Sequence, residues 1–209
     1  MIMILFGAPG VGKGTLAQRL QEARVGTQVS TGDLFRKEIA ANTEIGQAAR
    51  KYIDNGQWVP DDVTRNLVEG QILQNESLIL DGYPRTVKQI SDLDDMLTKQ
   101  GRKISLVVNV SADEAVVIDR IINRVVCSEC HAIYNLKYAP PKIPGKCDKC
   151  GESVVHRSDD SEEIVKKRFE EHNKKTKPLL DIYKQRGLVV EVNSEDKDAV
   201  EKVKKMLAL

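Results

Sequence analysis

The chain has 209 residues, of which 41% are hydrophobic and 30% charged, and its formal net charge is +1. This length allows one or two domains with a full core. A near-neutral charge offers no polybasic surface for nucleic acid or membrane lipid, and no apolar run approaches the roughly 18 residues of a transmembrane helix. Because Met1 leads directly into an apolar strand, no secretory signal is evident, and we expect a cytoplasmic protein.

A glycine-rich motif follows the first apolar segment, residues 2–6. It reads Gly7-Ala8-Pro9-Gly10-Val11-Gly12-Lys13-Gly14-Thr15 and leads into a predicted helix. A strand, a glycine-rich turn and a helix form the context in which the pattern G-x-x-x-x-G-K-[ST] binds phosphate. Glycines let backbone N–H groups converge on an anion at a helix N-terminus, and the lysine reaches the β- and γ-phosphates. The motif therefore predicts a nucleotide phosphate site.

Helices and apolar strands alternate along the rest of the chain. Strands are predicted at 27–29, 78–81, 104–110 and 188–192. Helical segments are predicted at 33–56, at 60–73, after the turn at 82–85 as far as about 99, at 113–124, at 160–186 and at 196–207. Near-continuous apolar strands that alternate with helices indicate an α/β fold with a parallel sheet covered on both faces.

All four cysteines lie in a segment with a different texture, residues 125–157, which has the character of a small inserted domain. They form two pairs, Cys127-x2-Cys130 and Cys147-x2-Cys150, with residues 131–146 between them. This spacing predicts a tetrahedral site for zinc or another thiophilic metal, and four thiolates leave no open position, so the metal would be structural. Two disulfides or free thiols are the alternatives, and His131 could replace Cys130 as a ligand.

Five motifs in order resemble the adenylate kinase family, in its long bacterial form with a metal-binding lid. They are Gly7–Thr15, Ser30-Thr31-Gly32-Asp33, Asp81-Gly82-Tyr83-Pro84-Arg85, Arg120 with Arg124, and Arg157-x-Asp159-Asp160 with Arg168. The resemblance implies a P-loop nucleoside monophosphate kinase fold with a five-stranded parallel sheet. It also implies a core domain (1–29, 60–124 and 163–209), an AMP-binding insertion (30–59) and a lid (125–162).

The resemblance further implies an enzyme that converts ATP and AMP into two ADP with Mg²⁺, and we expect no nucleic acid or membrane partner. We expect a monomer that serves adenine nucleotide homeostasis, nucleotide biosynthesis and AMP salvage. ATP is expected at Gly10, Val11, Gly12, Lys13, Gly14, Thr15, Arg120, Arg124, Ile133, Tyr134 and Asp196. AMP is expected at Thr31, Arg36, Gln57, Trp58, Val59, Gly82, Tyr83, Pro84, Arg85, Gln89, Arg157 and Arg168.

Phosphoryl transfer needs positioning and charge stabilisation, and arginine forks hold phosphate oxygens bidentately. Catalytic roles are therefore expected for Lys13, Arg85, Arg124, Arg157 and Arg168. Asp33 and Asp81 would hold Mg²⁺ through water, although Asp33 could instead cap a helix. A solvated surface charge is the alternative for Arg120. Trp58 departs from the small aliphatic residue expected in the family, which is tolerable if only its backbone contacts AMP.

Two other interpretations of the function stay open. The chain could be a kinase for UMP, CMP or GMP, although Thr31 and Gln89 favour adenine. It could also be a P-loop regulatory module whose zinc ribbon binds a macromolecule, which predicts an exposed basic or apolar patch. No histidine or cysteine is placed as a nucleophile, so the sequence favours direct in-line transfer beneath a lid that closes to exclude water.

Overall fold

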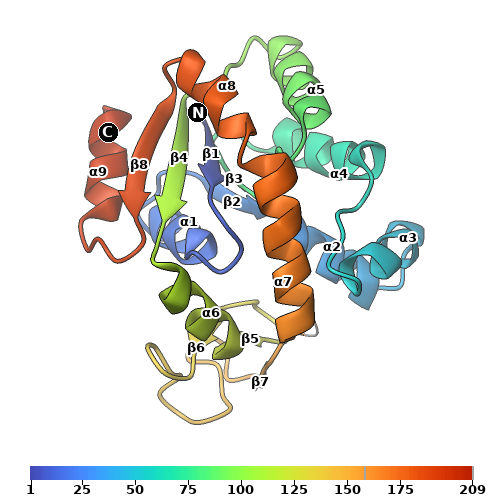
Figure 1. Ribbon diagram of the computed structural model, residues 1–209, viewed down its shortest axis with the longest axis vertical. Coiled ribbons are helices and arrows are strands. Elements are labelled where there is room, and N and C mark those ends of the chain that lie inside the picture. The colour runs from blue at the N-terminus through green and yellow to red at the C-terminus, as the bar shows by residue number, and fades with distance from the viewer. Residues whose placement is uncertain (158, 209) are drawn as a thin grey trace.

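A five-stranded parallel sheet forms the centre of the computed structural model, which describes residues 1–157 and 159–208 (Figure 1). The strand order is β2–β3–β1–β4–β8. The strands are β1 (Ile2–Phe6), β2 (Thr27–Ser30), β3 (Leu78–Asp81), β4 (Leu106–Ser111) and β8 (Val189–Asn193). In register, Ile4 of β1 pairs with Leu80 of β3 and Val107 of β4. The predicted parallel sheet is confirmed, and its carboxyl ends meet at one edge, where such sheets bind ligands.

Helices cover both faces of this sheet because its central strands are apolar on both sides. Ile2, Ile4 and Phe6 share a core with α4 (Asp61–Gln74), α5 (Val87–Thr98) and α8 (Leu179–Gln185). Met3 and Leu5 point the other way, into a core with α1 (Lys13–Glu22), α6 (Glu114–Ile122) and α9 (Ala199–Met206). The two-residue period of a strand thus places alternate side chains of β1 in two separate cores.

Two short helices between β2 and α4 form a small unit of their own, here called the α2–α3 unit. α2 (Thr31–Ala40) and α3 (Glu44–Ile53) share the buried residues Phe35, Ala49 and Val59. A Cβ on Gly46 would lie 2.1 Å from the Glu38 carbonyl oxygen, so the helices approach closely. The helical segment predicted at 33–56 is divided because the Thr43 hydroxyl accepts the N–H of Gly46 at 3.0 Å and begins a second helix.

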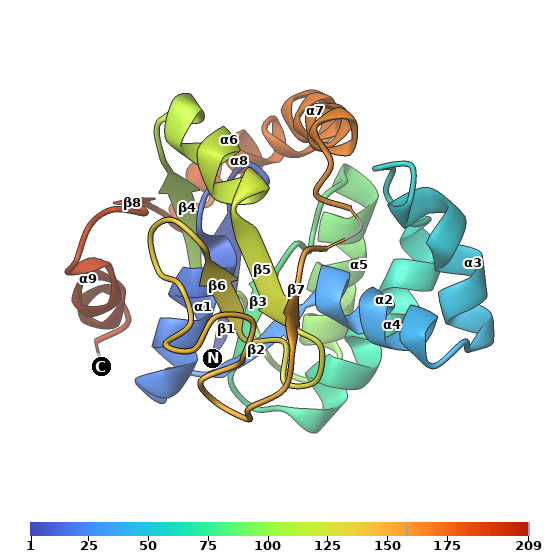
Figure 2. The same cartoon turned by 90° about the horizontal axis from the view of Figure 1, so that it is seen from below.

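A three-stranded antiparallel sheet forms the cysteine-bearing segment. It consists of β5 (Arg124–Cys127), β6 (Ile133–Asn135) and β7 (Val154–Val155), in the order β6–β5–β7. Its buried residues are Cys127, Ala132 and Cys147. In Figure 1 this sheet lies below the carboxyl ends of β4 and β8, and Figure 2 views the molecule from that side. A core this small, with two cysteines in it, is typical of a segment stabilised by a metal.

The long helix predicted at 160–186 is interrupted. α7 (Glu162–Glu171) runs into a π-helical turn, η1 (His172–Thr176), before α8 begins. The Lys177 N–H bonds to the His172 carbonyl at 2.9 Å, the i to i+5 spacing of a π-helix. Pro178 explains the break because proline lacks an N–H and its ring conflicts with the carbonyl four residues earlier. Among the described residues, no helix has the length and apolar content to cross a bilayer.

Candidate active site

The glycine-rich segment between β1 and α1 forms a tight loop around the Lys13 ammonium. Gly12 caps α1 with φ of 108°, and Gly7 has φ of 138°, values in the region that favours glycine. A Cβ on Gly7 would lie 2.4 Å from the Val110 carbonyl oxygen, which excludes any side chain there. Lys13 Nζ donates to the carbonyls of Gly7 and Ala8, at 2.8 Å each. A loop and a cation so placed at a helix N-terminus suit a phosphate group.

Lys13 lies on the wall of a cleft of about 410 Å³. Most of the predicted nucleotide residues share this wall: Gly10, Gly12, Gly14, Thr15, Thr31, Asp33, Arg36, Gln57, Trp58, Val59, Asp81, Gly82, Pro84, Arg85, Gln89, Arg120, Arg124, Ile133, Tyr134, Arg157 and Arg168. Three predicted residues have their side chains elsewhere. Val11 and Tyr83 are buried in the two cores beside the sheet, and the Asp196 carboxylate pairs with Lys202.

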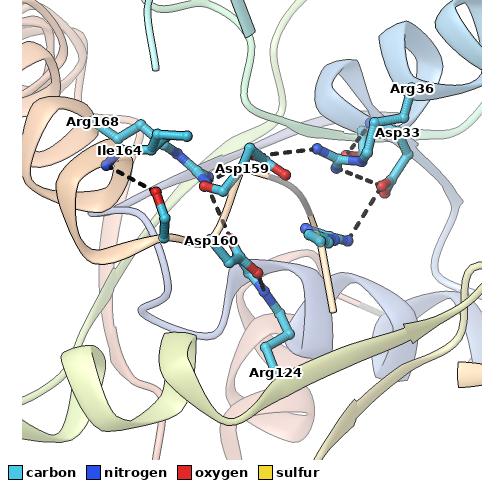
Figure 3. A network of polar contacts seen from close by, with 10 residues as sticks. Asp33, Arg36, Arg124, Asp159, Asp160, Ile164 and Arg168 are labelled. Atoms are coloured by element: carbon cyan, nitrogen blue, oxygen red, sulfur yellow. Dashed lines mark hydrogen bonds and ion pairs between the residues drawn. The ribbon is translucent and has the colours of Figure 1, made fainter. Parts of the chain in front are cut away.

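One part of an ionic network joins the cysteine-bearing segment to α7 (Figure 3). Asp160 accepts from Arg124 at two atoms, Nε at 2.8 Å and Nη2 at 2.5 Å. Arg168 of α7 lies 3.3 Å from the same carboxylate, whose side chain is only 4% exposed. Burial alone would lower the pKa of Arg124, but the bond to Asp160 and the charges of Asp160 and Asp159 together outweigh burial and raise this pKa. The shared carboxylate therefore holds two guanidinium groups side by side at the cleft.

The other part of the network joins the α2–α3 unit to the segment before α7 (Figure 3). Arg36 lies 2.7 Å from Asp33 and 3.4 Å from Asp159, while Arg157 lies 3.3 Å from Asp33. Burial would raise the pKa of Asp33, but Arg36 and Arg157 together lower it, so its carboxylate stays ionised. Ser30 caps α2 by accepting the N–H of Asp33 at 3.3 Å. The alternative of Asp33 as the helix cap is therefore wrong.

Arg85 follows β3 and is fixed by its neighbours in sequence. Its Nε donates to the Gly82 carbonyl at 2.7 Å, and its backbone N–H donates to Gln89 Oε1 at 2.7 Å. The Thr31 hydroxyl donates to the same Gly82 oxygen at 3.0 Å. Gln89 is buried, and its Nε2 donates to Asp61 Oδ1 at 2.6 Å, so its amide orientation is set at both ends. These bonds fix Arg85 on the wall of the cleft.

The β5–β6–β7 sheet covers the glycine-rich loop. A Cβ on Gly14 would lie 3.1 Å from Ile133 Cδ1, so β6 is directly above the loop. Arg120 of α6 donates to Ser194 Oγ at 2.7 Å, and its carbonyl accepts from Asn135 Nδ2 at 3.0 Å. Arg120 is thus anchored between β6 and the segment after β8. It is therefore not a freely solvated surface charge, which was the alternative. Asp81 lies across the loop, its Oδ2 being 3.7 Å from the same Gly14 position.

Positive charge is concentrated in this cleft. Burial lowers the pKa of Lys13 to about 8, against the opposing effect of Asp81. Burial and then Arg168 lower the pKa of Arg85 to about 10, and burial and then Arg36 do the same for Arg157. Shifts of this kind arise where cations crowd in a site of low polarity, and a polyanion would relieve them. The cleft is therefore suited to binding phosphate chains.

The four cysteines form a second site. Their Sγ atoms all lie within 4.8 Å of one another, with Cys127–Cys150 at 3.4 Å and Cys130–Cys147 at 3.5 Å. These distances exceed the roughly 2.05 Å of a disulfide, so the disulfide alternative is wrong. Zinc–sulfur bonds of about 2.3 Å in a tetrahedron place sulfurs about 3.8 Å apart, which these thiols approach. In the described part of the chain the cluster does not include His131.

A family model described as adenylate kinase matches residues 5–188. The adenylate kinase of Caldanaerobacter subterraneus subsp. tengcongensis is 41% identical over 212 residues, covering 99% of this chain and 96% of that protein. The chain belongs to the adenylate kinase family. Its adenylate kinase relative in Archaeoglobus fulgidus is 43% identical over 196 residues (92% and 90% covered), and that in Listeria monocytogenes is 40% identical over 213 (100% and 99%).

Membership of the adenylate kinase family confirms the resemblance found in the five motifs, and with it the P-loop nucleoside monophosphate kinase fold. The four cysteines belong to the segment whose strand β6 lies above the P-loop, a lid-like placement that fits the long form. Several residues of the cleft were missed by sequence analysis, among them His172 and Ser194. Burial and then Lys13 lower the pKa of His172 to about 4, so its imidazole is neutral near pH 7. The one sequence signal for the placement of His172 is Pro178, which indicates that the helix is irregular just before it.

Proposed function

We propose that this adenylate kinase family member transfers the γ-phosphoryl group of ATP directly to AMP and so forms two ADP, reversibly. The observation that carries the proposal is the convergence of Lys13, Arg85, Arg124, Arg157 and Arg168 on one cleft. Phosphoryl transfer requires positioning and charge stabilisation more than covalent chemistry, and these cations supply both. The reaction would serve adenine nucleotide homeostasis, biosynthesis and AMP salvage.

ATP would lie on the P-loop side of the cleft. Lys13 and the backbone of Gly10–Thr15 would hold its phosphates at the N-terminus of α1. Ile133 and Tyr134 would cover the nucleotide from the lid, and Arg120 would lie beside its adenine, supported by its bond to Ser194. Arg124 would contact the phosphates, because it lies at the start of β5 on the wall of the cleft. A contact from Asp196 would use its backbone, since its carboxylate pairs with Lys202.

AMP would lie on the side of the α2–α3 unit. Arg36 and Arg85 would hold its α-phosphate, and Thr31, Gln89 and the backbone of residues 57–59 would contact its adenine. The Gln89 amide has one donor and one acceptor position left after its bonds to Asp61 and Arg85, which supports recognition of adenine. Arg157 and Arg168 would close on the transferred group from the segment around Asp159.

Mg²⁺ would be held through water by Asp81, and when bound it would neutralise charge on the phosphates. The Asp81 carboxylate fits this role because it ends β3 beside the P-loop, next to Gly14 and Lys13. Asp33 fits only after its ion pairs with Arg36 and Arg157 open. A structural Zn²⁺ would be held in the lid by Cys127, Cys130, Cys147 and Cys150, whose thiolates fill a tetrahedral shell.

The proposed domains follow this division of the site: a core (1–29, 60–124 and 163–209), an AMP-binding insertion (30–59) and a lid (125–162). Closing the lid would exclude water, which could otherwise accept the phosphoryl group. The protein would act as a monomer. The converging arginines also argue against a regulatory module that binds a macromolecule through its cysteine ribbon.

The test is a comparison of acceptors. Initial rates of ATP consumption with Mg²⁺ would be measured against AMP, UMP, CMP and GMP, with Lys13→Ala as the control for adventitious kinase activity. We expect turnover with AMP that is lost in the control. Turnover with a pyrimidine nucleotide or GMP in preference to AMP would overturn the acceptor assignment, and no turnover with any of them would overturn the kinase proposal.

A further inference from the structure

The only tryptophan of the chain, Trp58, contacts two cations from separate elements. The Arg85 guanidinium carbon lies 5.6 Å from the centroid of the indole ring, and Lys175 Nζ lies 5.2 Å from it. Arg85 follows β3 in the floor of the cleft, whereas Lys175 belongs to the π-helical turn η1. One side chain from the α2–α3 unit thus meets the parallel-sheet domain at two places.

The loop that carries Trp58 is seated on α7. A Cβ on Gly56 would lie 3.1 Å from the Ile164 carbonyl oxygen and 3.4 Å from Lys167 Cβ. On the other side of Trp58, Val59 is buried in the core of the α2–α3 unit. Trp58 is therefore anchored to that unit, and its contact with Lys175 joins the loop to η1 beside the packing of Gly56 on α7.

The Trp58 indole stabilises the positive charge of Arg85, which burial and a neighbouring cation disfavour. Burial and the neighbouring charge of Arg168 lower the pKa of this arginine. Its Nε–H bond to the Gly82 carbonyl fixes one edge of the fork, and the Trp58 ring packs against the guanidinium group, whose carbon lies 5.6 Å from the ring centroid. Tryptophan has the strongest cation–π attraction of the aromatic side chains, so its ring both stabilises the charge and covers the guanidinium. A small aliphatic side chain at position 58 could do neither.

We propose that Trp58 is a positioning residue for the acceptor phosphate. Its indole holds the Arg85 fork in the orientation that binds phosphate, and its contact with Lys175 couples that orientation to the seating of the α2–α3 unit on η1. The inference rests on the proposed function, which assigns Arg85 to the AMP phosphate. It makes position 58 a determinant of AMP affinity through its side chain, and not only through its backbone.

Steady-state kinetics with Trp58→Leu, Trp58→Phe and Lys175→Met test the inference. Trp58→Leu should raise KM for AMP about three- to thirtyfold, the range for loss of a cation–π contact, and leave KM for ATP within about twofold. Trp58→Phe keeps an aromatic face and should recover most of the affinity. Lys175→Met should raise KM for AMP by a smaller factor. Lys51→Met is the matched control, since it removes a 5.1 Å contact with the Tyr52 ring in the same unit, and should change neither constant.

A calorimetric titration with AMP separates action through Arg85 from a general effect on the fold. In an Arg85→Met background, Trp58→Leu should weaken AMP binding no further, because the group it positions is absent. The inference would be overturned if Trp58→Leu weakened AMP binding in the Arg85→Met background as much as it does in the wild type. It would also be overturned if Trp58→Leu raised KM for AMP and KM for ATP equally, or left KM for AMP unchanged. Failure of the wild-type protein to use AMP at all would instead overturn the proposed function.

Discussion

Deprotonation of Lys13 should cause the fall in activity on the alkaline side of the pH profile, the alkaline limb. Burial lowers the pKa of this lysine from 10.5 to about 8, and although Asp81 opposes the shift, Arg85, Arg168 and Arg124 add to it. Only the protonated ammonium attracts phosphate. We therefore expect the free enzyme to lose affinity for ATP as the pH rises through about 8, well below the pH at which an ordinary lysine titrates.

The size of the shift also predicts how stability responds to pH and to ATP. A change from 10.5 to about 8 corresponds to ~3 kcal/mol at 1.36 kcal/mol per unit. The pKa of Lys13 is higher in the unfolded state, so the free-energy penalty on the native state is fully present below about pH 8. The penalty disappears as the pH rises to 10.5. The Lys13 contribution therefore makes the native state more stable as the pH rises through that window. A bound phosphate chain stabilises the ammonium and recovers part of that free energy.

The assay is kcat/KM for ATP at saturating AMP, measured from about pH 7 to about pH 9.5. A single ionisation predicts a roughly tenfold fall per pH unit above the pKa, with the limb of kcat displaced to higher pH because bound ATP raises the pKa. Lys13→Arg is the control: its guanidinium stays charged, so the limb should vanish whatever the absolute rate. A limb that persists in Lys13→Arg, or a flat wild-type profile, would refute the assignment.

Three further predictions concern the arginine cluster, the lid and the cleft histidine. Arg85→Lys keeps the charge but loses the planar fork, so kcat/KM for AMP should fall about 10- to 150-fold while KM for ATP is unchanged; equal losses for both substrates would contradict this role. Chelation, or Cys147→Ser, should expose the lid to limited proteolysis while the core keeps its cooperative thermal transition; one transition that removes the whole fold would count against an independently stable core. His172→Gln should lower kcat by less than about 100-fold, because direct transfer needs no imidazole; near-complete loss with a phosphohistidine trapped in the wild type would contradict direct transfer.

Local features of the fold and site could be predicted from the sequence. The P-loop needs only its own residues and the strand and helix beside it, so its position between β1 and α1 was predicted correctly. The two cysteine pairs likewise encode their own geometry, since each pair is a short local turn. The apolar strands predicted the parallel sheet because burial on both faces leaves a continuous hydrophobic pattern.

Contacts between distant segments could not be predicted. Arg36 and Asp159 are 123 residues apart, and nothing in either segment specifies that they meet at 3.4 Å. The placement of His172 depends on a π-helical turn, which changes the direction of side chains relative to a regular helix of the same sequence. A serine in a loop carries no sequence signal for a nucleotide site, so the contact of Ser194 with Arg120 could be seen only in the folded chain. The division of the helix at Thr43 was missed because a helix pattern continues on both sides of the cap.

The central claim is that Lys13 and the converging arginines transfer one phosphoryl group between two adenine nucleotides. Phosphorus NMR of wild-type protein with Mg²⁺, ATP and AMP tests it most directly, because it follows the disappearance of both substrates and the appearance of product in one sample. The account predicts two ADP formed for each ATP and AMP consumed, the reverse reaction from ADP alone, and neither in Lys13→Ala. Release of inorganic phosphate without consumption of AMP, or undiminished turnover in Lys13→Ala, would contradict it.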